Sequence, residues 1–263
     1  MSPETLPTQR CPLWRTAVVI LIALWCMGCS QDSQVLQVYA ASSLRDGFAS
    51  VAEAYQAEHP GVRVAVTHAG SQVLRLQIEQ GAPADVYASA NLEHMSALGE
   101  AGLTGKPEDF AGNAMVLIVP RENPAAITSF DQLPRARRVV IGTGGVPVGR
   151  YARQVLTRAD GALGSDFGAR VMAQVVSQES NARLVRAKVA LGEADAALVY
   201  QSDAASFDAV QAVAIPPSFN VEARYVMAVT TGAKNPASAR SWMAFVQSGR
   251  GQQMLARHGF GVR

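Results

Sequence analysis

Beyond its first 29 residues the sequence contains no cysteine. The 263-residue chain has three in all, Cys11, Cys26 and Cys29. The remaining 234 residues (263 minus 29) can therefore form no disulfide, and they offer no thiolate to a metal or to covalent catalysis. Their stability must come from a hydrophobic core, for which a chain with 49% hydrophobic residues has enough material.

Catalytic and metal-binding motifs are also lacking. No G-x-S-x-G elbow surrounds a serine, and no H-E-x-x-H pair occurs. The acidic residues Glu193, Asp195 and Asp203 are expected to be solvated or capping groups, not a carboxylate pair. We therefore expect no enzyme, no cofactor and no metal held by side chains. The histidines are dispersed along the chain, at His59, His68, His94 and His258.

Charge of either sign is sparse. The chain has 23 basic and 21 acidic residues, a net charge of +2, and subtracting Glu4, Arg10 and Arg15 leaves about +1 for the rest. These charges are scattered, so nothing indicates a surface for nucleic acid or for an anionic membrane. A chain of this length fits one large domain or two lobes.

Long apolar runs are confined to the N-terminus. Arg10 and Arg15 precede an apolar stretch at 17–28, and a polar stretch follows at 30–34. The run is shorter than the roughly 20 apolar residues that a membrane-spanning helix needs. We interpret residues 1–29 as a signal peptide, with a retained membrane anchor as the alternative, and expect the remainder in the periplasm.

The end of this leader resembles a bacterial lipoprotein cleavage box. In residues 25–30 a small residue, Gly28, stands directly before Cys29, the cysteine that would be acylated. Cys26 occupies the position where that box usually has leucine. Lipidation of Cys29 and ordinary cleavage with release are the two alternatives.

After the leader, short β-branched runs alternate with amphipathic helices. In the first of these helices Phe48, Val51, Ala52 and Tyr55 share one face. The alternation predicts an α/β fold with a mostly parallel sheet, whose ligands bind beyond the carboxyl ends of the strands. The predicted elements are strand 35–40, helix 43–58, strand 62–67, helix 71–80, strand 85–88, helix 91–101, strands 115–120 and 138–142, a helix from 149, strand 172–177, helix 180–191, strands 196–199 and 224–230, and helices 236–247 and 249–258.

Two strand-to-helix junctions carry exposed serines. The first strand leads into Ser42 and Ser43, and the second leads through Gly70 into Ser71. A helix start leaves backbone N–H groups unpaired and carries the positive end of the helix dipole, so each junction could hold an anion. Serine is also a common helix cap, which explains either junction taken alone. Two such junctions in one parallel sheet would bring both hydroxyls to the same rim.

The second half offers further donors. A glycine-rich turn at 142–149 opens a helix but lacks the spacing of a nucleotide-binding loop. Residues 179–183 open another helix and present more N–H groups. Tyr200 ends a buried strand, where its hydroxyl could donate into a cleft; packing with a wet tip is the alternative.

Several motifs together resemble the molybdate-binding protein of bacterial ABC importers, the ModA family. The similarity runs from about Val35 to the final Gly259-Phe260-Gly261-Val262. Its motifs are Tyr39-Ala40-Ala41-Ser42-Ser43-Leu44, Ala69-Gly70-Ser71, the run 77–86, Val146-Pro147-Val148-Gly149-Arg150-Tyr151-Ala152 and the run 192–200.

The resemblance implies a type II periplasmic-binding-protein fold, with two lobes joined by two hinge crossings, that closes on a tetrahedral oxyanion. Residues 30–115 with 225–263 would form the first lobe and residues 116–224 the second. The crossings would lie near 115–120 and 221–229. Each lobe would have a mostly parallel sheet flanked by helices.

The same resemblance implies five ligand-binding residues. Ser43 and Ser71 would donate hydroxyl and amide hydrogen bonds from the first lobe. Val148 and Ala182 would donate backbone N–H groups from the second lobe, and Tyr200 its hydroxyl. This chain departs from the family in residues 143–145, which lack the usual Pro-Glu pair, and at Ala182, where the family usually has valine.

The implied function is capture of molybdate, and of tungstate, by a monomeric protein that delivers it to the ABC permease of the inner membrane. Another tetrahedral oxyanion such as sulfate is the alternative ligand. A periplasmic serine hydrolase using Ser43 or Ser71, with His68 three residues before Ser71, is a remote alternative. A sensor that reports closure to a membrane receptor would share the site.

If Cys29 is the lipidation site, cells that express the chain and are fed a labelled fatty acid should incorporate label into it, and a Cys29→Ala variant should not. A wild-type protein without label would contradict the lipoprotein interpretation and favour ordinary cleavage.

Overall fold

The computed structural model describes residues 34–205 and 207–261. The expected signal peptide, residues 1–29, and Cys29 lie outside these residues. Within the described part, no helix has the length and apolar character required to cross a membrane. The described chain forms one compact unit.

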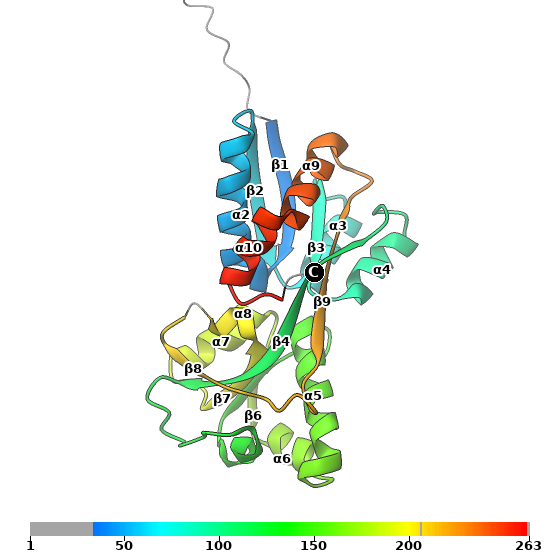
Figure 1. Ribbon diagram of the computed structural model, residues 1–263. Helices are drawn as coiled ribbons and strands as arrows, with labels where there is room; N and C mark the ends of the chain where they lie inside the picture. Colours follow the sequence, from blue (N-terminus) through cyan, green and yellow to red (C-terminus); the bar gives the residue numbers. More distant parts are fainter. Residues whose placement is uncertain (1–33, 206, 262–263) are drawn as a thin grey trace, which may run out of the picture. The chain divides into compact units, whose positions relative to one another are not determined.

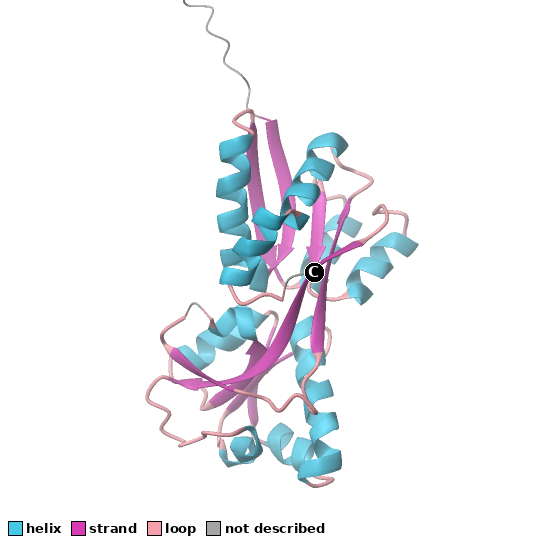
Figure 2. Cartoon of the chain, in the orientation of Figure 1, coloured by secondary structure: helices cyan, strands magenta, loops and turns pink. Residues whose placement is uncertain are grey.

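Strands and helices alternate from Gln34 onward, and the expected α/β class is confirmed (Figures 1 and 2). The first elements are β1 (Gln34–Ala41), the 3-10 turn η1 (Ser42–Leu44), α2 (Arg45–Glu58), β2 (Val62–Ala69), α3 (Ser71–Glu79), β3 (Val86–Ser89), α4 (Leu92–Glu100) and β4 (Glu108–Pro120). They are followed by η2 (Phe130–Arg135), β5 (Val139–Gly142), α5 (Pro147–Leu163), α6 (Phe167–Ala173), β6 (Val175–Glu179), α7 (Ala182–Ala190) and β7 (Ala196–Tyr200). The last are α8 (Gln201–Ala204), β8 (Val210–Val213), β9 (Glu222–Val229), α9 (Pro236–Gln247) and α10 (Gly249–Arg257).

Four short elements were not predicted: η2, α6, α8 and β8. The expected strand at 172–177 begins later, at Val175, because α6 occupies the residues before it. The strand expected at 115–120 begins at Glu108, since its first half, which lacks a continuous apolar run, is paired along β9.

The strands are joined in the order β2-β1-β3-β9-β4-β7-β5-β6, with β8 on β4. β1 pairs in parallel with β2 and β3, and β5 pairs in parallel with β6 and β7. The long strands β4 and β9 run antiparallel to each other and to their other neighbours, so the sheet is mixed. β4 pairs with β9 through its first half and with β7 and β8 through its second (Figure 1). The division into two lobes remains a prediction.

Helices cover both faces of the strands, which explains why the central strands are apolar at consecutive positions. In β3, Val86 and Ala88 pack into a cluster with α2 and α9, whereas Tyr87 points to the opposite face, toward α3 and α4. In β7, Ala197 and Val199 face α7, and Tyr200 joins the cluster that also contains residues of α5. This alternation directs the Tyr200 side chain to the face on which α5 begins.

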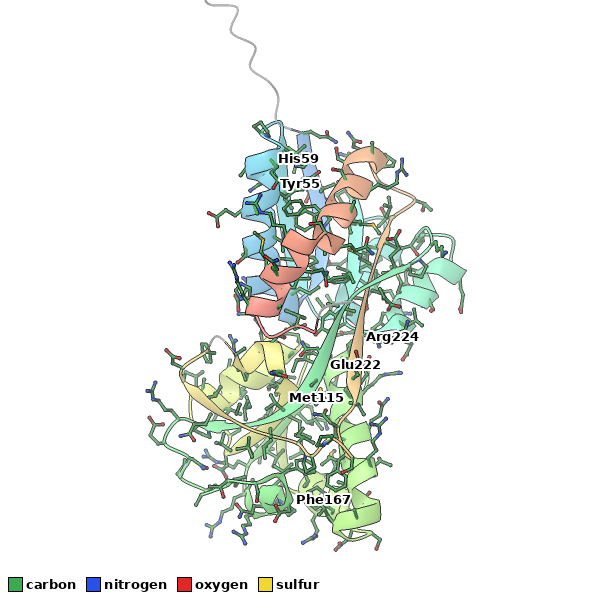
Figure 3. The ribbon with its side chains drawn as sticks, viewed as in Figure 1. Tyr55, His59, Met115, Phe167, Glu222 and Arg224 are labelled. Atoms are coloured by element: carbon green, nitrogen blue, oxygen red, sulfur yellow. The ribbon has the colours of Figure 1, made fainter. Side chains whose placement is uncertain are left out.

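An aromatic cluster fixes the terminal helices against α2. Trp242 packs edge-on against Phe48 at 5.6 Å and against Tyr55 at 5.4 Å between ring centroids. Tyr55 also stacks on His59 at 4.1 Å, at the end of α2 (Figure 3). The helix α9 thus packs its Trp242 ring into the part of the core that α2 begins.

Asp203 is a buried carboxylate, and our expectation that it is solvated or caps a helix is wrong. The residue is 1% exposed, and neither carboxylate oxygen has a hydrogen-bond partner among the described residues. Arg186 donates to the Asp203 backbone carbonyl at 2.9 Å instead, with its guanidinium 3.9 Å from the centroid of the Phe207 ring. Burial raises the pKa of Asp203 to about 6, although Arg186 and Arg183 oppose that rise.

This pKa predicts a pH-dependent stability. Because the folded state disfavours ionised Asp203, the free energy of unfolding should fall as pH rises from about 4 to about 6. Asp203→Asn should remove that loss and stabilise the protein by about 1 to 3 kcal/mol at pH 7.5, with little effect at pH 4. Denaturant unfolding between pH 4 and pH 7.5 measures the free energy of unfolding of each variant. Asp131→Asn, at an exposed position, is the control. Parallel pH profiles for Asp203→Asn and the wild type would contradict the assignment.

Candidate ligand-binding site

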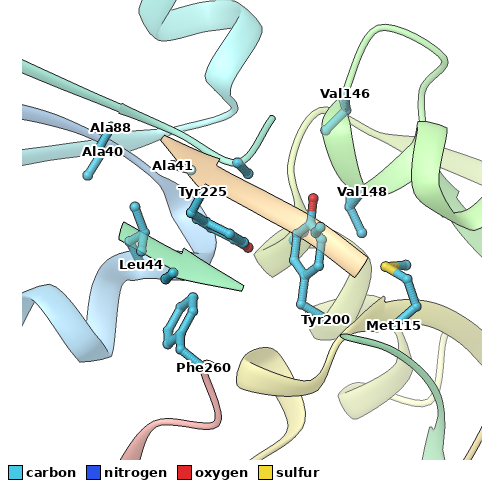
Figure 4. Packing of buried hydrophobic residues seen from close by; sticks show 14 of the residues in the cluster. Ala40, Ala41, Leu44, Ala88, Met115, Val146, Val148, Tyr200, Tyr225 and Phe260 are labelled. Carbon is cyan, nitrogen blue, oxygen red and sulfur yellow. The ribbon is translucent and has the colours of Figure 1, made fainter. Parts of the chain in front are cut away.

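The five residues predicted from the sequence lie around one small cavity. The space between them that is free of protein atoms is about 190 Å³. None of the residues that line it carries a charged side chain. The lining consists of Ala41, Ser42, Ser43, Gly70, Ser71, Ala90, Val146, Val148, Asn181, Ala182 and Tyr200. Figure 4 shows Val146 and Val148 near Tyr200, with Ala41 and Leu44 beyond Tyr225.

Four helical segments begin at this cavity, each directly after a strand or loop. Ser43 lies in η1, which continues into α2; Ser71 is the first residue of α3; Val148 is the second of α5; and Ala182 is the first of α7. The first three starts have no side-chain cap. By contrast, the helices α4, α9 and α10 are each capped by the side chain of their N-cap residue. Uncapped helix starts leave N–H groups available to a ligand.

The amides of Val148 and Ala182 lie in the first turn of a helix, where an N–H group has no hydrogen-bond partner within the helix. Pro147 precedes Val148 and has no N–H, and the first amide that bonds back to the N-cap carbonyl is that of Arg150. In α7 the Asn181 side chain accepts from Leu184, two residues beyond Ala182. A bound acceptor could therefore use both amides without breaking a helical hydrogen bond.

The loop before α5 is held close to the helix although it lacks the Pro-Glu pair of the family. A side chain on Gly149 would come within 2.2 Å of the Thr143 carbonyl and 2.3 Å of the Gly142 carbonyl. Glycine at 149 therefore lets the loop close over the first turn of α5, next to the Val148 amide.

Ser71 has a hydroxyl proton to give. Its Oγ accepts a hydrogen bond from the Ala90 N–H at 3.1 Å, and an N–H can only donate. The Ser71 backbone carbonyl is held separately by the Tyr87 hydroxyl at 2.9 Å. Ser71 is 1% exposed, so its proton has little access to water and is available to a ligand in the cavity.

Tyr200 brings an unpaired hydroxyl to the same cavity. The residue is 1% exposed, and its Oη has no hydrogen-bond partner among the described residues. Burial raises the pKa of Tyr200 well above its ordinary value, so the phenol keeps its proton. A buried hydroxyl without a partner is costly, and a ligand that accepts its proton would remove that cost.

Sequence reasoning missed the partner of Ser43. The Ser43 Oγ lies 2.8 Å from the hydroxyl of Tyr225, a fully buried residue of β9. Tyr225 is 182 positions away in the sequence, so no local pattern could have connected them. The only available signal was the prediction of a strand at 224–230.

His68 does not activate Ser71. Its Nδ1 has no hydrogen-bond partner among the described residues, and the bond to Ser71 Oγ comes from Ala90. Burial, reinforced by Arg45, lowers the pKa of His68 to about 4, so the ring is neutral at pH 7. Among the described residues, the hydrogen-bond partners of the Ser43 and Ser71 hydroxyls are Tyr225 and Ala90, so neither serine has the base that the hydrolase alternative requires.

Contacts across the cavity hold its two walls together. Gln72 of α3 donates to the Ser180 carbonyl at 2.9 Å, and Arg183 of α7 donates to the Ser42 carbonyl at 3.1 Å. Arg183 also forms an ion pair with Asp46. The five predicted residues are each 4% exposed or less, so a solute could enter only if these walls separated.

A second pair of contacts joins α4 to the start of α5. His94 Nε2 donates to the Gly145 carbonyl at 3.0 Å, and burial lowers the pKa of His94. Glu93 forms an ion pair with Arg150. Arg150 and Arg183 are thus engaged with carboxylates, and neither lines the cavity.

Gly70 marks the closest approach between the walls. A Cβ at this position would lie 2.4 Å from the Ser180 carbonyl oxygen, inside contact distance. The backbone at Gly70 has φ −62° and ψ 142°, values that any residue can adopt. Glycine is therefore needed here for space, not for backbone conformation.

No group of three or more histidine, cysteine, aspartate or glutamate residues that could hold a metal ion occurs in the described part of the chain. The donors around the cavity are hydroxyls and amides, which suit an anion and not a cation.

Known proteins similar to this chain are solute-binding proteins. The family model described as bacterial extracellular solute-binding protein matches residues 36–261. The molybdate-binding protein ModA of Mycobacterium tuberculosis (strain ATCC 25618 / H37Rv) is 37% identical over 236 residues, covering 89% of this chain and 87% of that protein.

Two solved structures are similar in fold. The substrate-binding domain of a putative molybdenum ABC transporter from Clostridium difficile has a TM-score of 0.67 and 27% identity, covering 88% of this chain and all of that one. The periplasmic molybdate-binding protein of Azotobacter vinelandii has a TM-score of 0.74 at 19% identity, covering 87% of this chain and 99% of that one.

Proposed function

This chain belongs to the bacterial extracellular solute-binding proteins, and we propose that within this family it captures molybdate, and also tungstate, for an ABC importer. One observation carries the proposal: the cavity is surrounded by buried hydroxyls and helix-start amides, and no charged side chain lines it. The relatives named for molybdate supply the choice of ion.

A dianion transferred from water needs several hydrogen-bond donors to replace the water molecules that solvated it. The proposed donors are the hydroxyls of Ser43, Ser71 and Tyr200 and the amides of Val148 and Ala182. Each is buried, and the Tyr200 hydroxyl lacks any other partner among the described residues. Donors fixed by the fold stabilise the anion without a cation that would have to be desolvated with it.

We further propose that binding is accompanied by closure of two lobes, residues 30–115 with 225–263 and residues 116–224. The contacts from Gln72 to Ser180 and from Arg183 to Ser42 would form on closure. In each pair one residue belongs to the first proposed lobe and the other to the second. An open form would lack these contacts and would expose the five donors to solvent.

The location and partners of the protein are proposed from the same family. We expect a monomer in the periplasm, released by its signal peptide or held by a lipid on Cys29, that delivers the ion to the permease of the inner membrane. The binding protein takes up the ion first and the permease receives it afterwards, so the closed, ion-bound form would be the one that meets the permease.

Isothermal titration with molybdate, tungstate and sulfate tests the function. We expect binding of molybdate and tungstate at micromolar concentration or tighter, and weaker binding of the smaller sulfate. Binding of sulfate alone would move the assignment to another oxyanion. Binding of none of the three would contradict the proposal.

Tyr200→Phe should weaken molybdate binding, because the phenol is proposed to donate to the anion. Loss of a hydrogen bond to a charged group costs about 1 to 3 kcal/mol, equivalent to roughly 5- to 150-fold in Kd. Titration of the variant measures the change, and Tyr55→Phe, in the aromatic cluster around α2, is the matched control. Unchanged affinity would make Tyr200 a packing residue only.

Gly70→Ala should prevent full closure, because its methyl group would meet the Ser180 carbonyl. We expect at least about 5-fold weaker molybdate binding, since one overpacked contact of this size costs about 1 kcal/mol or more. Gly61→Ala is the control, as a Cβ at Gly61 meets nothing within 4 Å. Equal affinities for the two variants would argue against a lobe closure that brings Gly70 next to Ser180.

A further inference from the structure

Tyr225 stands directly behind one of the proposed ligand donors. Its hydroxyl is 2.8 Å from the Ser43 Oγ, yet Tyr225 itself does not line the cavity. The residue is fully buried, so its hydroxyl has no access to water. Any effect that it has on a ligand must therefore pass through the cavity residues that it contacts, of which Ser43 is the one within hydrogen-bond distance of its hydroxyl and Tyr200 packs against its ring.

The proton in this hydrogen bond can in principle belong to either oxygen. Each hydroxyl has only one proton to donate. An oxyanion in the cavity can only accept, so Ser43 must direct its proton to the anion when the site is filled. The Ser43 oxygen is then left as an acceptor, and Tyr225 must be its donor.

Tyr225 is suited to remain that donor. Burial raises the pKa of Tyr225 well above its ordinary value, so the phenol stays protonated. Its ring is held by edge-on contacts with Phe260 at 5.3 Å and Phe110 at 6.2 Å, and it lies 5.8 Å from the Tyr200 ring (Figure 4). The hydroxyl therefore cannot swing away from Ser43 without disturbing the core.

The backbone around Tyr225 is also irregular at this point. β9 pairs with β4 through Tyr225↔Ala111, and the register shifts between Asp109 and Ala111. A bulge of this kind re-aims the side chains beside it and is common next to binding sites. The extra residue, Phe110, is the one whose ring contacts Tyr225.

Ser71 provides the parallel case. Its Oγ accepts from the Ala90 N–H, a donor that cannot reverse, so the Ser71 proton must point elsewhere. No backbone N–H of the described residues donates to the Ser43 Oγ, and the phenol of Tyr225 lies next to that oxygen instead. Each serine oxygen thus has one neighbouring protein group that can donate to it.

We propose that Tyr225 is a positioning residue of the oxyanion site: its hydroxyl donates to Ser43 Oγ and so directs the Ser43 proton into the cavity. The proposal rests on the proposed function, because it requires an anion that accepts from Ser43. It adds a residue that neither borders the ligand nor stands out in the sequence.

A double-mutant cycle tests this role by titration with molybdate. Tyr225→Phe keeps the ring and should weaken binding about 3- to 10-fold, as expected for one lost hydrogen bond that orients a donor. Ser43→Ala should weaken it more, about 10- to 100-fold. In the Ser43→Ala background, Tyr225→Phe should change Kd by less than about 2-fold, because the group through which it acts is gone.

The control is Tyr55→Phe, which removes a buried phenol hydroxyl in the aromatic cluster around α2 and should leave Kd unchanged. Equal affinities of Tyr225→Phe and wild type would overturn the proposal. The same fold-change with and without Ser43 would also overturn it, since Tyr225 would then act through packing. With either result, molybdate binding by the wild type would leave the proposed function standing, and only the role of Tyr225 would be rejected.

A wild-type protein that bound none of molybdate, tungstate and sulfate would end the proposed function and this inference with it. Should Tyr225→Phe fail to fold, neutron diffraction of the wild type with molybdate decides the question. A hydrogen on Tyr225 Oη pointing to Ser43 is the expected result, and a hydrogen on Ser43 Oγ pointing to Tyr225 would overturn the proposal.

Discussion

The site depends on one constraint: a buried anion without a countercharge needs donors that are already in place before it arrives. In water a dianion is solvated by molecules that turn toward it, and a protein replaces them only if its own dipoles are fixed. Helix starts provide such dipoles, because their first N–H groups have no partner within the helix and point along its axis. The rest of the structure serves to bring several of these starts to one point.

The alternating fold achieves this convergence. The strands β1, β2 and β6 are each followed by a helical segment whose first residues line the cavity, so the positions of Ser43, Ser71 and Ala182 follow from the sheet. The strands β4 and β9 pair along their length and connect the two groups of parallel strands. Contacts such as Gln72 to Ser180 then close the walls on each other. Arg150 and Arg183 are paired with carboxylates, and no charged side chain lines the cavity.

Much of this was predictable because it is local. The junctions at Ser43 and Ser71 and the strand end at Tyr200 are visible as changes of pattern over a few residues, and the resemblance to a known family added Val148 and Ala182. The contacts that pair distant segments were not predictable. Tyr225 meets Ser43 only because β9 pairs with β3 and β4. Asp203 was expected at the surface because the sequence of a four-residue helix does not reveal which residues cover it. Short elements such as α6 and β8 were missed for the same reason, since tertiary packing and not local pattern holds them.

The central claim is that this cavity binds molybdate through uncharged donors alone. The most direct measurement is an anomalous difference map at the molybdenum absorption edge, from crystals grown with molybdate. The account predicts one strong peak within hydrogen-bonding reach of the hydroxyls of Ser43, Ser71 and Tyr200 and of the amides of Val148 and Ala182, with no lysine or arginine side chain in contact. A peak elsewhere, or one held by a cationic side chain, would contradict it.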